Sequence, residues 1–548
     1  MKKRFVSALL VATMAVTALA GCGGSSDAGS SNGGSAASGT ESTGGAVSEG
    51  GTTTTSTGTY TADNPYHLVF EFVEFYDQDD AARTAVQDAL NDYMRENYQI
   101  EVEFLPVSFA EYQTTTQLML SGGDELDVLP IMYNYASSWI NMGGIYDMSD
   151  LMNTDDGAKI VEALGSEETA HVGTMNGVLF GFPANKESVE LGGLCMRADI
   201  CDELGLTEKY NLDREDSDVF TGDSLTWDEA EEIFAAVKEA HPEMYPLYMS
   251  NSDQLNRFDF EDTLVDGFGV LNLATDREST TVVNRFETQE YKDIITRLAK
   301  WYDAGYIYPD AATDTQGTAT MMKAGNTFSY ATAIKPGFLA EAKAANGCDC
   351  YVLYLNPEPN DGYITTTNVS FIDTGIAAQS KDPEMAFKFI SALYSDPTVY
   401  NMWQYGIQDV NYQLQDDGTA TFVDGEDGGN YKYHQNSGWA MGNQFQSYVW
   451  NDGTKDANYW DKLKKHNDWA FYSPAYGFMW DSSNYSTEIT ALTNAYETYR
   501  SALDTGSVGL ANVDSTIQAL NDALYAAGLQ DVMDEKQAQL DAWLAENK

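Results

Sequence analysis

Positively charged residues are scarce in this sequence. Its 548 residues include 30 lysines and arginines against 84 aspartates and glutamates, which gives a formal net charge of −54. A protein that binds nucleic acid must neutralise phosphates with basic side chains, and binding to anionic lipid headgroups makes the same demand. The composition therefore argues against both partners, and an exported protein kept soluble by its charge is the simplest interpretation.

The residues of several catalytic motifs are also missing. The chain has five histidines, no H-E-x-x-H pair and no Gly-Lys dipeptide. These absences exclude the zincin motif and the Walker A phosphate loop. The Gly-x-Ser-x-Gly elbow of many esterases does not occur after residue 63. Because 84 carboxylates are too many for a glycosidase pair to be judged by counting, no catalytic residue is predicted.

Cysteine is rare as well, with five in the whole chain. A body of this size does not depend on disulfides, unlike small secreted domains. The C-x-C pair at 348 and 350 has no neighbouring histidine and no second C-x-C, so it does not indicate a metal site. We expect Cys195, Cys201, Cys348 and Cys350 to be unpaired thiols, with one bridge, 195–348 or 201–350, left open. Neither a metal nor a cofactor is predicted.

The first 63 residues have the pattern of an export signal followed by a tether. Three basic residues precede an apolar run, residues 5–20, that is too short to span a bilayer. The stretch Leu19-Ala20-Gly21-Cys22 resembles the bacterial lipobox, in which the cysteine is lipidated and the chain is cut before it. Residues 1–21 are then a signal peptide, and residues 22–63, rich in Gly, Ser and Thr, are a flexible tether. A soluble secreted protein with a chance cysteine is the alternative.

The chain after the tether begins with alternating strands and helices. Strand patterns cover residues 67–75, 100–107 and 126–131, and the first helix between them has apolar residues at i, i+3, i+4 and i+7. This order predicts a parallel α/β sheet, in which ligands bind at the carboxyl ends of the strands. The residues that follow the first and third strands are therefore candidate ligand contacts: Tyr76, Asp77, Tyr133 and Asn134.

A second α/β pattern follows, which agrees with the expectation that a body of this length forms two lobes. Residues 194–206 read as a strand that enters a helix, and Thr226 and Glu229 form a capping box before a helix with an apolar face. Residues 244–251 are a further strand, residues 291–304 an amphipathic helix, and residues 321–332 a turn and a strand.

Several short motifs, each of low specificity alone, occur in an order that resembles a known protein family. SGGDELDVLP, NGVLFGFP, WDEAEEIFAAVKE, WYDAGYIYPD and MMKAGNTFSY follow one another as they do in the extracellular solute-binding proteins of ABC importers. The chain is similar to the large oligosaccharide-binding group of that family, which is related to the maltodextrin-binding proteins. The likeness covers roughly residues 65–400. The tail, with AFYSPAYGFMWDSS and QLDAWL, resembles the Gram-positive aldouronate-transport lipoproteins.

The resemblance implies a type II periplasmic-binding-protein fold, with two α/β lobes, a cleft between them and crossing hinge strands. The crossings are expected near 182–187 and 351–357, with residues 369–379 returning to the first lobe. The expected division is lobe 1 at 64–185, lobe 2 at 186–352, a return to lobe 1 at 353–400, and a C-terminal helical region at 401–548 that completes the lobes and the cleft.

The resemblance also implies a function. A monomeric, lipid-anchored receptor on the extracellular face of the cell membrane would bind a carbohydrate, in particular an oligosaccharide, and deliver it to the permease subunits of an ABC transporter. It would not be an enzyme. Two alternatives stay open: a receptor of the same fold for a peptide or another polar solute, and a surface lipoprotein that binds or cleaves glycans.

The remaining candidate ligand residues come from the second lobe and the tail. The resemblance places a ligand loop after strand 244–251, and six tryptophans fall between 403 and 480, of which we expect at least two to line the cleft. Aromatic rings stack on the apolar faces of sugars, and polar side chains reach the hydroxyls. An acidic sugar would need Arg257, whereas the negative field of the chain favours a neutral one. The candidates are Asn251, Asp253, Gln254, Arg257, Trp403, Tyr405, Trp480 and Asp481.

Overall fold

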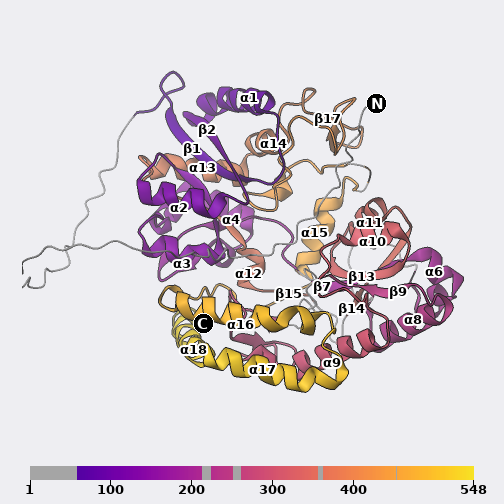
Figure 1. Ribbon diagram of the computed structural model, residues 1–548. Helices are drawn as coiled ribbons and strands as arrows, with labels where there is room; N and C mark the ends of the chain where they lie inside the picture. The colour runs from indigo at the N-terminus through magenta and orange to yellow at the C-terminus, as the bar shows by residue number, and fades with distance from the viewer. Residues whose placement is uncertain are drawn as a thin grey trace, which may run out of the picture. The chain divides into compact units, whose positions relative to one another are not determined.

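Two five-stranded sheets organise the part of the chain that follows the tether (Figure 1). The computed structural model describes residues 59–189, 191–212, 224–250, 261–355, 362–451, 453 and 455–548. Residues Thr59–Lys548 form one compact unit. Within the described ranges, no helix is both long and apolar enough to cross a bilayer.

The first sheet has the strand order β2-β1-β3-β16-β6. Strand β1 runs parallel to β2 and β3, whereas β16 runs antiparallel to β3 and β6. We call the sheet and the helices packed on it lobe 1. Its strands are β1 (Tyr66–Glu74), β2 (Ile100–Ser108), β3 (Val128–Met132), β6 (Phe182–Pro183) and β16 (Ile372–Ile376).

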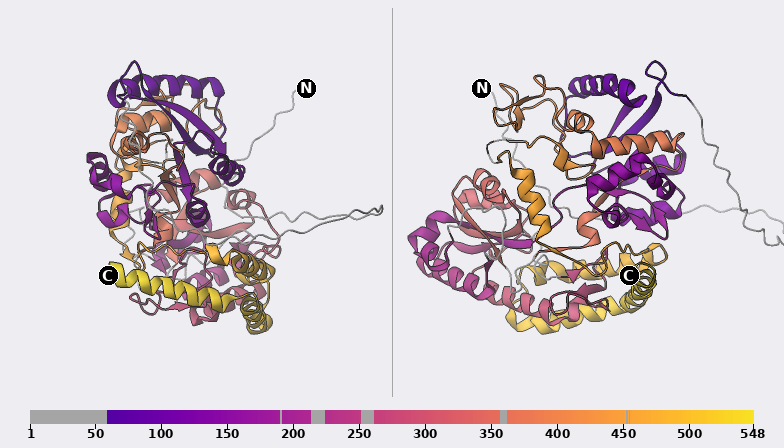
Figure 2. Two further views of the ribbon diagram at one scale, coloured as in Figure 1. Left: turned by 90° about the vertical axis from the view of Figure 1, so that its left-hand side faces the viewer. Right: turned by 180° about the vertical axis from the view of Figure 1, so that it is seen from behind.

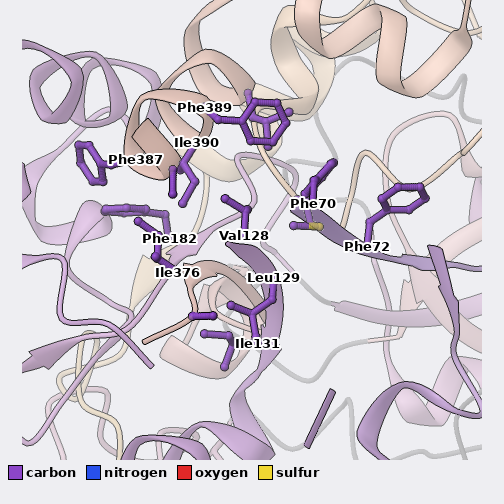
Figure 3. Close-up of a cluster of buried hydrophobic side chains, with 14 of the residues drawn as sticks. Phe70, Phe72, Val128, Leu129, Ile131, Phe182, Ile376, Phe387, Phe389 and Ile390 are labelled. Carbon is purple, nitrogen blue, oxygen red and sulfur yellow. The ribbon is translucent and has the colours of Figure 1, made fainter. Parts of the chain in front are cut away.

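Helices cover the first sheet and give it a continuous apolar core. Because β1 and β3 are covered on both faces, seven of the nine residues of β1 and all five of β3 are buried, rather than every second one. Figure 3 shows Phe387, Phe389 and Ile390 of α13 against side chains of the sheet. The helices are α1 (Asp80–Tyr98), α2 (Tyr112–Gly122), α3 (Tyr133–Asn141), α4 (Asp155–Leu164), α5 (Glu167–Ala170), α12 (Thr366–Val369), α13 (Pro383–Ser395) and α14 (Pro397–Tyr405).

The second sheet has the strand order β8-β14-β7-β13-β9. Strand β7 lies antiparallel between β13 and β14, while β9 is parallel to β13 and β8 is parallel to β14. We call this sheet with its helices lobe 2. Its strands are β7 (Leu191–Arg197), β8 (Ser224–Leu225), β9 (Tyr245–Tyr248), β13 (Thr327–Ile334) and β14 (Cys350–Leu355).

Helix α8 of lobe 2 begins where its capping residues predict. The side chain of Thr226 accepts from the backbone of Glu229, whose carboxylate accepts from the backbone of Thr226, so the predicted capping box is confirmed. The helices are α6 (Ala198–Glu203), α7 (Leu206–Tyr210), α8 (Trp227–Ala240), α9 (Gln289–Asp303), α10 (Thr318–Ala324) and α11 (Phe338–Asn346).

The chain passes between the two sheets twice. It leaves the first sheet after β6 and enters the second at β7, then leaves the second sheet after β14 and re-enters the first at β16. Two α/β sheets joined by crossing segments are the fold that the sequence predicted, and this fold is confirmed.

Residues beyond 405 add to both lobes. Helices α16 (Ser486–Asp504), α17 (Val513–Ala526) and α18 (Leu529–Asn547) pack together, and their apolar faces share one core with α9 of lobe 2 (Figures 1 and 2). Helix α15 (Tyr459–Asp468) precedes them. The remaining strands are short: β4 (Thr174–Met175), β5 (Val178–Leu179), β10 (Glu261–Asp262), β11 (Val270–Asn272), β12 (Val282–Val283), β15 (Tyr363–Ile364), β17 (Tyr412–Leu414), β18 (Ala420–Phe422) and β19 (Phe471–Tyr472).

Candidate ligand-binding site

Aromatic side chains gather where the strands of the first sheet end. Strands β1, β2 and β3 are parallel and stop at the same edge, and antiparallel β16 begins there, with Ile372 opposite Met132. Residues just outside these strand ends are therefore neighbours. We call six of them the aromatic edge: Phe75 and Tyr76 after β1, Phe109 after β2, Tyr133 after β3, Phe371 before β16, and Trp439 from the tail.

The rings of the aromatic edge contact one another in pairs. The ring centroids of Phe75 and Trp439 are 4.8 Å apart, and those of Phe75 and Phe109 are 6.0 Å apart with nearly parallel planes. The rings of Tyr133 and Phe371 are 5.6 Å apart. These contacts hold five of the six rings, all except Tyr76, in place before any ligand is bound.

Two rings of the aromatic edge are open to solvent. Tyr76 is 45% exposed and Phe109 is 40% exposed, while the other four rings are half-buried. Since neighbouring strands lie about 4.8 Å apart, an edge of four strands extends over about 15 Å. A row of aromatic rings at the functional end of an α/β sheet, two of them exposed and four half-buried, indicates a binding surface rather than a packing surface.

Polar side chains lie next to two of the rings in the chain, and another polar side chain attaches the tail to the loop after β1. Asp77 and Asn134 are exposed beside Tyr76 and Tyr133. The side-chain amide of Gln78 donates to the carbonyls of Tyr76, at 2.8 Å, and His434, at 3.1 Å, and its oxygen accepts from the His434 amide at 2.8 Å. Gln78 thus fastens the tail segment that leads to Trp439 to the loop after β1.

Four predicted contacts in lobe 2 lie outside the described residues. Asn251, Asp253, Gln254 and Arg257 belong to the segment that follows β9, and β9 itself is the predicted strand, ending at Tyr248 in the second sheet. A role for these four residues in ligand binding stays a prediction.

Trp403 and Tyr405 do not lie where the sequence suggested. Both belong to α14, because a second helix begins directly after α13 instead of a loop. Trp403 is 1% exposed, and its ring lies 5.5 Å from that of Phe70 in the core of lobe 1. Tyr405 is buried and its hydroxyl donates to the carbonyl of Tyr448 at 3.0 Å. The expectation that they contact a ligand is wrong for this structure, since neither ring is accessible.

Trp480 is also a packing residue rather than a ligand contact. It is 1% exposed, its indole nitrogen donates to Asp266 at 2.9 Å, and the ammonium of Lys536 lies 5.1 Å from its ring centre. The same ammonium is 2.7 Å from Asp266. Trp480 thus attaches the segment before α16 to the core of lobe 2, which corrects its predicted role.

Asp481 links the two lobes. Its carboxylate accepts hydrogen bonds from the Ser137 hydroxyl on α3 and, at 2.8 Å, from the Asn176 amide in the β4–β5 turn, both in lobe 1. Its backbone amide donates to Gln539 of α18 at 2.9 Å. Burial acts to raise the pKa of Asp481, but the hydrogen bonds from Ser137 and Ser483 outweigh it, and the pKa lies below its usual range. Its predicted contact with a ligand stays a prediction.

Helix α15 holds the first crossing segment. The side chain of Asn467 donates to the Lys186 carbonyl at 2.9 Å and accepts from the Ser188 amide at 2.8 Å. Between these two residues, Glu187 pairs with Lys335 at the end of β13 over 2.7 Å. Burial raises the pKa of Glu187, but the nearby lysine charges dominate and lower it to about 2. The crossing segment therefore has a defined position in this structure.

A depression elsewhere on the surface is lined by charged rather than aromatic side chains. A depression of about 650 Å³ lies between α8 and α9 and is lined mainly by charged side chains. Arg297 pairs there with Asp228 at 2.9 Å. The lining of the depression contains no aromatic side chain, so we prefer the aromatic edge. Within the described ranges, no group of His, Cys, Asp or Glu side chains is arranged to hold a metal ion.

Sequence reasoning identified part of the aromatic edge. Tyr76 and Tyr133 were chosen because they follow predicted strands, and Trp439 was among the six clustered tryptophans. Phe109 was missed although it follows the predicted strand 100–107, so the same rule would have found it. Phe371 precedes an antiparallel strand, and only the sheet topology places it at this edge.

Comparisons with known proteins agree with this architecture. Residues 88–424 match the family described as bacterial extracellular solute-binding protein, and residues 474–545 match a domain of unknown function, DUF3502. A carbohydrate ABC transporter substrate-binding protein of Streptococcus pneumoniae is 24% identical over 474 residues, which cover 82% of this chain and 85% of that protein.

Solved structures show the same fold at low sequence identity. The N-glycan transport solute-binding protein NgtS of S. pneumoniae superposes with a TM-score of 0.71 at 22% identity, covering 88% of this chain and 100% of that one. The S. pneumoniae substrate-binding protein FusA, solved in complex with kestose, gives a TM-score of 0.58 at 15% identity, covering 88% and 100% of the two chains.

Proposed function

The chain belongs to the bacterial extracellular solute-binding proteins, and from this premise we propose that it captures an oligosaccharide outside the cell and delivers it to the permease of an ABC transporter. Proteins of this family are receptors rather than enzymes, and no catalytic role is assigned to any residue. A carbohydrate ligand is supported by the similar streptococcal protein, which is described as a carbohydrate ABC transporter substrate-binding protein.

The aromatic edge is the observation that carries the proposal. A sugar ring has apolar faces and a rim of hydroxyls, so it stacks on flat aromatic rings and accepts or donates hydrogen bonds at its rim. Tyr76 and Phe109 are exposed, and the exposed polar residues Asp77 and Asn134 follow Tyr76 and Tyr133 in the chain. The row of rings extends over about four strands, which suits a chain of sugars better than a single ring.

A neutral oligosaccharide fits the charge of the protein best. The net charge of −54 slows the approach of an anion, and a carboxylate ligand would need a well-placed arginine. Arg257 is the residue that could serve, and it follows β9. A uronic-acid ligand that depends on Arg257 is therefore the competing proposal within the same fold, and a peptide receptor is a second one.

Ligand delivery would follow from closure of the lobes. An oligosaccharide held at the aromatic edge would also contact the segment after β9, and by bridging the lobes it would shift the population toward a closed form that the permease recognises. Lipidation of Cys22 and the tether of residues 22–63 would keep a monomeric receptor at the outer face of the membrane, as in Gram-positive bacteria.

Titration calorimetry with neutral oligosaccharides, matched uronic-acid oligosaccharides and peptides tests the proposal. We expect binding of a neutral oligosaccharide, and a loss of affinity of about tenfold or more in Tyr76→Ala. Tyr472, which is 53% exposed away from the first sheet, provides the matched control: Tyr472→Ala should leave affinity unchanged. Binding of peptides alone, or equal effects of both variants, would refute the proposal. Release of shorter sugars by the purified protein would favour a glycan-cleaving enzyme instead.

A further inference from the structure

Three cysteines of lobe 2 lie together around one side chain. The amide of Asn346 donates to the sulfur of Cys350 at 3.5 Å and to that of Cys195 at 3.6 Å. The sulfurs of Cys348 and Cys350 are 4.0 Å apart. All three residues are free thiols, as is Cys201. The same amide also reaches the Tyr330 hydroxyl at 3.2 Å, so Asn346 is held in place at the centre of the group.

The three thiols differ in position and exposure. Cys195 is buried within β7, and Cys350 is buried as the first residue of β14. Cys348 follows Gly347, the residue that caps the C-terminal end of α11, and it is partly exposed. Cys201 on α6 packs in a different part of the core of lobe 2.

The surroundings favour a reactive thiolate at one of the three. The hydrogen bond from Cys195 and that from Asn346 lower the pKa of Cys350 to about 6, although burial opposes them. Burial raises the pKa of Cys348 to about 11 and that of Cys201 to about 12. The lowered pKa makes Cys350 the one of the three thiols that most readily forms the thiolate, which is the nucleophilic form.

We propose that Cys348 and Cys350 form an oxidisable dithiol site that peroxide converts to a disulfide. The Cys350 thiolate attacks an oxygen of hydrogen peroxide, which breaks the O–O bond, oxidises the sulfur to sulfenic acid and releases hydroxide. The Cys348 thiol then attacks that sulfur, the S–S bond forms, and the sulfenic oxygen leaves as water. Two thiols and one peroxide give one disulfide and two waters.

The geometry selects Cys348 as the partner. It occupies a turn beside a glycine, so rotation of its side chain can shorten the 4.0 Å separation of the two sulfurs. Cys195 is fixed in a strand, where it pairs with Val352, so Cys350 is its diagonal neighbour. Diagonal neighbours have Cβ atoms about 7 Å apart, whereas a disulfide needs about 4 Å.

Peptide mapping of the full chain separates the thiols. Trypsin cleaves after Lys186, Arg197, Lys209, Lys343 and Lys381. Cys195 and Cys201 then lie in peptides 187–197 and 198–209, and the proposed pair lies in peptide 344–381. After peroxide treatment and alkylation, we expect peptide 344–381 to be lighter than its reduced, unalkylated form by two hydrogen atoms. Neither of its cysteines should be alkylated. Reduction with dithiothreitol should make both cysteines available for alkylation again. Cys195 and Cys201 should stay alkylated, with Cys201 oxidised more than about tenfold more slowly.

Two variants sharpen the test. In Cys348→Ser, the sulfenic acid should persist on Cys350 and be trapped by dimedone, while Cys201→Ser should form the disulfide as the parent does. Full alkylation of peptide 344–381 after peroxide would overturn the proposal. A cross-link between peptides 187–197 and 344–381 would overturn the choice of partner, and failure of dimedone to label Cys350 would overturn its role as the nucleophile.

Discussion

The aromatic core of lobe 1 and its aromatic edge use the same kinds of residue in the same strand. Phe70 and Phe72 of β1 are fully buried and pack against Trp403. Phe75 and Tyr76 follow a few residues later and are half-buried and exposed. Inside the sheet, helices cover both faces, whereas beyond the strand end the rings stay partly open to solvent. The position relative to the strand end, and not the residue type, therefore separates rings that stabilise the fold from rings that can bind a ligand.

Removal of a core ring should have the largest effect on stability. Trp403→Ala leaves a cavity among Phe70, Phe72 and Tyr400, and we expect the free energy of unfolding to fall by about 3–5 kcal/mol. Urea unfolding measures this loss. Trp439→Ala is the matched control from the edge, and it should cost less than about 1 kcal/mol because its ring is already half-hydrated. Equal losses in the two variants would refute the distinction between core and edge.

The core also contains a carboxyl group whose ionisation should make its stability depend on pH. Glu71 of β1 is fully buried, and one of its oxygens accepts from Thr116. Burial raises its pKa from 4.5 to about 7. Between pH 4.5 and 7 the folded state therefore holds a proton that the unfolded state releases, so stability falls as pH rises through this window and levels off above it. Across this window the titration of Glu71 lowers the free energy of unfolding by about 3 kcal/mol.

An isosteric variant isolates this effect. Glu71→Gln resembles the protonated side chain, and the difference in unfolding free energy between pH 5 and pH 7 should shrink by most of that contribution. Burial also raises the pKa of Asp373 to about 7. Part of the fall in unfolding free energy with rising pH should therefore remain in this variant. Self-repulsion of the acidic surface is common to parent and variant and cancels in the comparison. An unchanged slope in Glu71→Gln would show that burial does not raise the pKa of Glu71.

Removal of an edge ring should instead affect ligand affinity. Trp439→Ala takes away the partner of Phe75, and we expect oligosaccharide binding to weaken by about 1–3 kcal/mol while unfolding changes little. Calorimetry on the folded variant measures the change. Trp460→Ala, which removes a half-buried ring packed on Phe445, is the control that should bind normally. A larger affinity loss in the control than in Trp439→Ala would contradict the assignment of the site.

The sequence predicted those features that depend on local pattern. Strand β1 is recognisable from HLVFEFVEF, and α8 from its capping box, because both patterns reflect local backbone geometry. The carboxyl ends of predicted strands located Tyr76 and Tyr133. These rules need no knowledge of tertiary contacts.

The predictions that failed concern side chains whose burial is set by tertiary contacts. Trp403 seemed to follow a helix, but Asp396 caps a second helix that carries Trp403 into the core. Trp480 stands beside polar residues in the sequence, yet Asp266 and Lys536 bury it, and they are more than fifty residues away along the chain. Proximity to polar residues in a sequence therefore says little about whether a tryptophan is exposed.

The smallest effect is expected at the contact between the lobes. Asp481→Asn keeps the size of the side chain but replaces one carboxylate oxygen with an amide group, so either Ser137 or Asn176 loses its acceptor. A hydrogen bond to a charged group is worth about 1.5–3 kcal/mol, and at the half-buried Asp481 we expect a loss near the lower end of that range. This loss should appear as faster hydrogen exchange in α3 and in the β4–β5 turn. Asp468→Asn, at an exposed position of α15, should leave exchange unchanged. Affinity for the oligosaccharide should change by less than about threefold, because the rings of the aromatic edge are held by contacts within lobe 1 and the tail. A tenfold loss of affinity in Asp481→Asn would instead mean that Asp481 touches the ligand, as its sequence position first suggested.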